Sequence, residues 1–243
     1  ILSPDLSALI RTEGLDLTTT DIEKIIFVAI RSEILNDIAR NQDESDRQMI
    51  EENSLSIINS LLPGNMEYPM RYIVMKAVHS SADFAIANLI GYSRRFYETM
   101  MMKLKERATI IADSEMVKAG IYSKPVISRN KVVCYLNDDE TVEIAKQRGM
   151  TRSAAGIMRG LLENRNSIIV VGNAPTALDQ AIIMIEENQW YDTPVIGVPV
   201  GFVNAKKVKE KLAGTSIEHF TVYGQRGGSP IAASIVNGFG RFL

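Results

Sequence analysis

The sequence predicts an α/β protein of three layers (α/β/α), in which helices cover both faces of a parallel β-sheet, and two observations support this fold class. First, short apolar runs alternate with amphipathic stretches from about residue 108 to residue 243. Continuous apolar strands that alternate with helices are typical of parallel sheets buried on both faces. Second, the first 105 or so residues carry helical patterns. We therefore expect an N-terminal helical extension, residues 1–45, before a main domain, residues 46–243.

Helical signals come first along the chain. Residues 20–23 (Thr-Asp-Ile-Glu) form a capping-box pattern, which opens a stripe of isoleucines at helical spacing. A second helix over residues 55–62 is followed by a Pro-Gly stop. Pro69 suits the first turn of a third helix, which has His79 at its end. A fourth helix is expected over residues 94–107.

Five strands and the helices between them follow. The expected strands cover residues 109–113, 131–136, 167–172, 194–198 and 219–224. The helical patterns cover residues 151–164, 175–188, 204–213 and 230–239. This order of elements favours a five-stranded, flavodoxin-like parallel sheet. Ligands of such sheets bind beyond the carboxyl ends of the strands, so the turns that follow the strands are the candidate site.

The composition argues against several classes of protein. The 243 residues carry a net charge of −2 at pH 7, and 46% of them are hydrophobic, which is ordinary for a globular protein. This charge gives no reason to expect nucleic acid or a membrane surface as a partner. The apolar runs are too short to span a bilayer, and the start shows no signal-peptide pattern. We expect a cytoplasmic protein.

Thiol and imidazole groups are few. Cys134 is the single cysteine, which excludes a disulfide framework and suits a reducing compartment. Its place in an apolar strand indicates inert packing. The only histidines are His79 and His219, and no cluster of Cys, His and carboxylates has zinc spacing, so we expect no metal site. His219 begins a strand and is expected to be structural.

Glycine-containing turns follow three of the predicted strands. They are residues 172–176 (Gly-Asn-Ala-Pro-Thr), 199–203 (Pro-Val-Gly-Phe-Val) and 224–230 (Gly-Gln-Arg-Gly-Gly-Ser-Pro). Free N–H groups at a helix start attract anions, and Arg226 suits a carboxylate or phosphate. A strand–helix turn needs glycine in any case, so one turn alone decides nothing. Three turns at one sheet edge predict a site for a large anionic ligand. No dinucleotide fingerprint and no Walker A pattern is present.

Three polar residues outside these turns each have two interpretations. His79 stands beside two serines and four residues before Asp83; it suits proton transfer near neutral pH, or serves as a structural hydrogen bonder at a helix end. Asp113 follows the first predicted strand, where it caps the next helix or contacts a ligand. Arg152 begins a helix, where a cation opposes the helix dipole. Such a charge indicates either anion binding or a solvated surface side chain.

Seven motifs in this order resemble the precorrin-8X methylmutase family. They are residues 78–83 (VHSSAD), 113–117 (DSEMV) with 120–121, 130–134, 151–155 (TRSAA), 172–178 (GNAPTAL), 199–203 (PVGFV) and 226–229 (RGGS). The resemblance covers about residues 48–243, and residues 51–58, with Ser54, look like the N-terminal segment of the family. The first 45 or so residues do not match.

The resemblance implies an isomerase of cobalamin (corrin) biosynthesis. The family moves a methyl group from C-11 to C-12 of precorrin-8X, or of cobalt-precorrin-8, to give hydrogenobyrinate or cobyrinate. It further implies that His79 is the general acid, that no cofactor is required, and that the enzyme is a homodimer with its site near the subunit interface. The residues expected to bind the tetrapyrrole are Ser54, Asp113, Met116, Val117, Arg152, Ser153, Asn173, Ala174, Thr176, Gly201, Phe202, Arg226, Gly227, Gly228 and Ser229.

Other functions stay open at this point. A carrier of the same fold would hold a corrinoid or tetrapyrrole without converting it, and would not need His79. A nucleotide- or flavin-binding protein is disfavoured by the missing fingerprint, and a purely structural protein leaves the three turns unexplained. The sequence does not distinguish a cobalt-free from a cobalt-containing substrate. For residues 1–45 the hypothesis is an added dimer contact, because their isoleucine stripe must be buried.

Overall fold

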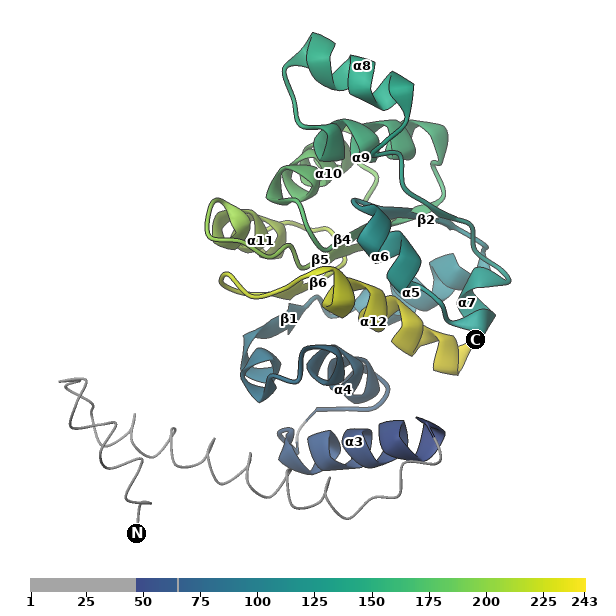
Figure 1. Ribbon diagram of the computed structural model, residues 1–243, viewed down its shortest axis with the longest axis vertical. Helices are drawn as coiled ribbons and strands as arrows, with labels where there is room; N and C mark the ends of the chain where they lie inside the picture. The colour runs from purple at the N-terminus through teal and green to yellow at the C-terminus, as the bar shows by residue number, and fades with distance from the viewer. Residues whose placement is uncertain (1–46, 65) are drawn as a thin grey trace, which may run out of the picture. The chain divides into compact units, whose positions relative to one another are not determined.

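The computed structural model of the chain describes residues 47–64 and 66–243 (Figure 1). The chain forms two units, residues 1–57 and residues 58–243. Helix α3 (Arg47–Leu61) is the first element of the described residues. The predicted helix with the isoleucine stripe, and the predicted extension as a whole, lie outside the described residues.

The second unit alternates strands with helices, as the sequence predicts. After α3 its elements are α4 (Met70–Ser81), the 3₁₀ helix η1 (Phe84–Leu89), β1 (Ile90–Tyr92), α5 (Phe96–Lys105), β2 (Thr109–Ala112), α6 (Glu115–Gly120), α7 (Lys124–Ile127), β3 (Val132–Val133), α8 (Asp139–Arg148), α9 (Arg152–Glu163), β4 (Ser167–Val171), α10 (Pro175–Asn188), β5 (Val195–Gly197), α11 (Ala205–Ala213), β6 (His219–Val222), α12 (Ser229–Phe239) and the 3₁₀ helix η2 (Gly240–Phe242). Among the described residues, no helix is long and apolar enough to cross a membrane.

Within the described residues, the sheet has six strands in the order β1-β6-β5-β4-β2-β3. Strands β2 to β6 are parallel to one another, and β1 is antiparallel to β6. The five predicted strands are present, although β3 is much shorter than expected, and the prediction of a five-stranded sheet is wrong by one edge strand. A sequence of Ile-Gly-Tyr carries no apolar run of its own, so β1 escapes a local search. It forms because Ile90 pairs with Val222, a residue far along the chain.

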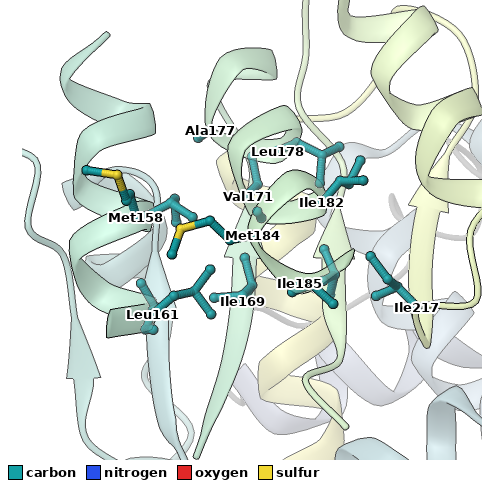
Figure 2. Close-up of a cluster of buried hydrophobic side chains, with 14 of the residues drawn as sticks. Met158, Leu161, Ile169, Val171, Ala177, Leu178, Ile182, Met184, Ile185 and Ile217 are labelled. Carbon is teal, nitrogen blue, oxygen red and sulfur yellow. The ribbon is translucent and has the colours of Figure 1, made fainter. Parts of the chain in front are cut away.

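Helices α9, α10 and α11 cover one face of the sheet. Two alternate residues of β4, Ile169 and Val171, lie in one buried cluster with Leu178, Ile182 and Ile185 of α10 (Figure 2). The spacing of the three α10 residues places them on one stripe of the helix. All five side chains are fully buried, and burying each one stabilises the fold by about 1.5–3 kcal/mol.

Helices α5 and α12 cover the opposite face. Phe220 of β6 contacts Phe96 of α5 with ring centroids 5.8 Å apart, and Phe96 contacts Phe239 of α12 at 5.9 Å. All three rings are fully buried. Aromatic pairs at such separations add about 0.5–1.5 kcal/mol beyond the burial of their area. The sheet therefore lies between two helical layers, as the sequence predicts.

Helix α4 packs along α12 and runs antiparallel to it. Near the end of α12, a methyl group placed on Gly238 would lie 3.1 Å from the side chain of Ile73 in α4. Nearer the start of α12, the Ser234 hydroxyl donates a hydrogen bond to the Ser80 hydroxyl at 3.0 Å. Because α12 begins just after β6, its start marks the carboxyl edge of the sheet. The end of α4, which carries His79, therefore lies near this edge.

Candidate active site at the carboxyl edge of the sheet

Asp113 organises the turn at the point where the strand order reverses. It directly follows β2, and its carboxylate accepts hydrogen bonds from the backbone N–H groups of Gly172, Asn173 and Ala174 at 3.0, 2.8 and 2.7 Å. Burial raises the pKa of this carboxyl group, while the three donors act against that rise. Asp113 is only 2% exposed. Its oxygens are therefore engaged within the protein, and it shapes the turn that carries Asn173.

The turns after β2 and β4 meet the start of α12. Ser114 caps α6 by accepting a hydrogen bond from the Val117 N–H, and its hydroxyl lies 3.5 Å from the Ser229 hydroxyl. A methyl group on Gly172 would lie 2.8 Å from Cα of Ser229, so only glycine permits this approach. Val117 and Ser229 are both buried. Like Asp113, these two predicted substrate contacts lie beneath the surface of the site.

The turns after β5 and β6 are joined through the backbone. The Gly228 N–H donates to the Val198 carbonyl at 2.9 Å, and the Gly201 N–H donates to the Gln225 carbonyl at 3.1 Å. At Gly227, where φ is +154°, a methyl group would lie 2.2 Å from the Val198 oxygen. The glycines predicted to approach a ligand thus also allow the two turns to approach each other.

Arg226 brings the end of α4 into the same site. Its Nε lies 2.9 Å from a carboxylate oxygen of Asp83, and the other oxygen of Asp83 accepts the Ala85 N–H at the start of η1. His79 lies four residues before Asp83, in the last turn of α4, and is exposed. The ion pair therefore joins the segment that carries His79, the predicted proton donor, to the turn that carries Arg226.

The starts of α9 and α10 lie side by side at this edge. The Thr151 hydroxyl caps α9 by accepting the Ala154 N–H, and it lies 2.8 Å from the Thr176 hydroxyl of α10. Arg152, the next residue, is exposed, and Ser153 is half-buried. The positive ends of two helix dipoles and one cation form a surface that attracts anions.

Two large apolar side chains are exposed at this edge. Met116 on α6 is 69% exposed, and Phe202, on the turn after β5, is 94% exposed. Large side chains with so little cover offer contact area to an apolar ligand or to a partner. Between α10 and α11, beside Thr176, lies a hollow of about 280 Å³ lined by Pro175, Thr176, Asp179, Asn204, Val208 and Lys211.

Several residues singled out in the sequence have hydrogen-bond partners within their own part of the chain or are buried. The Ser54 hydroxyl donates to the Ile50 carbonyl within α3, in the first unit of the chain. His219 is buried, its Nδ1 lies 2.8 Å from the Ile217 carbonyl, and burial lowers its pKa. Burial raises the pKa of Cys134 to about 11, which keeps it a thiol at neutral pH. No group of three or more potential metal-binding side chains occurs in the described part of the chain.

Two residues that sequence reasoning did not select belong to the site. Asp83 is paired with Arg226, and Lys209 of α11 donates from its Nζ to the Arg226 carbonyl at 2.7 Å. Asp83 carried a signal, because it lies in the motif with His79. Lys209 carried none, since nothing in its neighbourhood along the chain indicates that it is buried.

The fold and the site define a doubly wound α/β protein, a class in which ligands bind at the carboxyl edge of the sheet, near the point where the strand order reverses. Here that edge offers exposed cations, helix starts and apolar side chains.

Comparison with known proteins makes the assignment specific. The family model of CbiC, precorrin-8X methylmutase, matches residues 49–241. A cobalt-precorrin-8 methylmutase of Methanothermobacter thermautotrophicus is 38% identical over 201 residues, which cover 83% of this chain and 90% of that protein. A precorrin-8X methylmutase of Pseudomonas aeruginosa is 31% identical over 167 residues, which cover 68% of this chain and 80% of that protein. A solved structure described as a precorrin-8X methylmutase related protein shares 61% identity, with a TM-score of 0.77, over 78% of this chain and 100% of the other.

The chain belongs to the precorrin-8X methylmutase family. It is therefore an enzyme, an intramolecular transferase (isomerase) of cobalamin biosynthesis.

Proposed function

We propose that the chain moves a methyl group from C-11 to C-12 of precorrin-8X or cobalt-precorrin-8, and so forms hydrogenobyrinate or cobyrinate. The observation that carries this proposal is the position of His79, which is exposed at the end of α4. Four residues later, Asp83 forms an ion pair with Arg226, which lies on the turn after β6. Relatives of this chain bear both substrate names.

His79 is the proposed general acid. Migration of a methyl group within one conjugated system needs no external nucleophile, but it needs the ring held in one tautomer and a proton delivered at one position. Substrate and product are isomers, so each proton that His79 gives to the ring is balanced by a proton that the ring loses. A positioned general acid contributes about 10²–10⁴ in rate. No cofactor or metal is required for this step.

The rest of the site is proposed to bind a flat, apolar ring edged with carboxylates. Arg152 and Arg226 supply charge-assisted hydrogen bonds, and Met116 and Phe202 supply apolar contact. Further contacts are proposed from Ser153, Asn173, Thr176 and Gly227, and from Ala174, Gly201 and Gly228, whose N–H groups are already bonded within the protein. Asp113, Val117 and Ser229 are buried, so they support the turns from beneath.

A homodimer with the site near its interface is also part of the proposal. Phe202 and Val203 are 94% and 78% exposed, although both are apolar. A second copy of the chain, or the substrate, would remove this surface from water. Measuring the mass of the full chain in solution tests the assembly, and a monomer at micromolar concentration would contradict it. The cytoplasm is the proposed compartment.

The decisive experiment incubates the purified chain with precorrin-8X and, separately, with cobalt-precorrin-8, and follows the absorption spectrum. Rearrangement changes the conjugated system, so turnover is visible directly. We expect the wild type to convert one of the two forms, and His79→Ala to bind it without converting it at a comparable rate. A melting temperature of His79→Ala equal to that of the wild type shows that the fold is intact.

Each other outcome has a definite meaning. Binding of both forms without conversion by the wild type would support a corrinoid carrier of the same fold. A His79→Ala variant that converts substrate at the wild-type rate would remove the acid role but leave the methylmutase reaction. Absence of binding to either form would overturn the proposed substrate class.

A further inference from the structure

Lys209 is a buried cation that the proposed chemistry does not use. It lies on α11, the helix that comes between β5 and β6 in the chain (Figure 1). Its side chain is fully buried. Its ammonium donates a hydrogen bond to the Arg226 carbonyl at 2.7 Å. No carboxylate forms an ion pair with Lys209 among residues 47–64 and 66–243.

Burial of this ammonium opposes folding. A charged group removed from water is destabilising unless an opposite charge or several hydrogen bonds compensate it. Burial lowers the pKa of Lys209 to about 8, and no neighbouring charge contributes to the shift. A methionine would fill a similar volume without the charge, and such replacements of buried charges are often neutral or stabilising. Stability alone therefore does not account for a lysine at this position.

The group that Lys209 holds lies in the turn that presents Arg226. On either side of Arg226, Gln225 and Gly228 form backbone hydrogen bonds with the turn that follows β5. The Arg226 carbonyl lies between these two hydrogen-bonded residues. It is followed by Gly227 and Gly228, and glycine backbones can adopt many conformations. The bond from Lys209 fixes the Arg226 carbonyl, and thus the direction in which its side chain leaves the backbone. Asp83 holds the guanidinium at the other end.

We propose that Lys209 is a positioning residue, which fixes the Arg226 peptide so that the guanidinium meets a carboxylate of the substrate. This inference rests on the proposed function, since it gives a role within that same site. It predicts that the loss of Lys209 weakens substrate binding rather than folding or chemistry.

The test compares Lys209→Met with the matched control Lys207→Met, an exposed lysine on the same helix. Steady-state kinetics, thermal unfolding and hydrogen exchange of the Gly227 and Gly228 amides are measured for both. For Lys209→Met we expect KM to rise about tenfold, the loss of one well-placed charge-assisted bond. We expect kcat within about twofold of the wild type, an unchanged or higher melting temperature, and faster exchange at both glycines. Lys209→Gln, which keeps a donor, should recover part of the KM.

Three outcomes would overturn the proposal. The first is a Lys209→Met variant with an unchanged KM while the wild type is active. The second is an unchanged rate of amide hydrogen exchange at Gly227 and Gly228. The third is a Lys209→Met chain that melts well below the wild type or does not fold, because that would make the lysine structural. An inactive wild type would instead contradict the proposed function, and hydrogen exchange would still decide whether Lys209 fixes the turn.

Discussion

The carboxylate of Asp113 accepts a hydrogen bond from the backbone N–H of Ala174 at 2.7 Å, across 61 positions of the chain. This bond joins the carboxyl ends of β2 and β4, which are neighbours in the sheet. The chain passes to β3 on one side of this pair and to β5 on the other, so the strand order reverses here. The turn with Asn173 is therefore placed by a residue beneath the site.

Replacement of Asp113 by asparagine should destabilise the fold. The amide keeps one acceptor oxygen but turns N–H donors toward the backbone donors of Gly172, Asn173 and Ala174. We expect a loss of about 2 kcal/mol, which lowers the melting temperature by roughly 4–8 °C. Asp139→Asn, at an exposed position in the first turn of α8, is the control. Equal shifts in the two variants would show that the three hydrogen bonds contribute little.

Gly227→Ala should displace the turn that carries Arg226. Its methyl group would lie 2.2 Å from the Val198 oxygen, which is a backbone atom. Gly224→Ala is the matched control, because φ is also positive there, at +78°, but nothing lies within 4 Å. We expect Gly224→Ala to cost about 1–2 kcal/mol through strain alone. Gly227→Ala should cost more and also weaken substrate binding, as measured by unfolding and by titration; equal effects would argue against the clash.

Arg152→Gln should weaken substrate binding without destabilising the fold. A cation at the start of α9 opposes the helix dipole, so its removal should stabilise the chain by about 0.3–1 kcal/mol. Loss of a charge-assisted bond to a carboxylate should raise the dissociation constant about tenfold. Arg129→Gln, exposed and just before β3 at the opposite edge, should change neither quantity. Titration followed by absorption measures the affinity, and equal affinity in wild type and Arg152→Gln would place the substrate elsewhere.

The stability difference between Lys209→Met and the wild type should depend on pH. The pKa of Lys209 is about 8 in the folded chain and 10.5 ordinarily, so the folded state binds fewer protons between these values. Wild-type stability therefore rises with pH across this window relative to the methionine variant, which has no proton to lose. Below pH 8 the variant should have its largest advantage in melting temperature, and that advantage should shrink toward pH 10.5. A difference that stays constant with pH would contradict the lowered pKa.

The site could be predicted in part. His79, Arg152, Arg226 and the three glycine turns could be selected as candidates because each is a local pattern or a family motif in the sequence. The common edge of the three turns followed from the rule for parallel sheets. The sequence left open whether Asp113 caps a helix or contacts a ligand. In the structure it is only 2% exposed and accepts three backbone N–H groups, so it holds the turn after β4 in place instead.

By itself the sequence determined the family, the five parallel strands and the alternation of helices with them. These follow from apolar periodicity and from motifs, which are properties of neighbouring residues. Only the tertiary structure decided that Ile90 begins a sixth strand, that Asp113 is internal and that Lys209 is buried beneath Arg226. Each of these depends on contact with a segment distant in the chain, and a residue's burial or pairing is fixed by which segment packs against it.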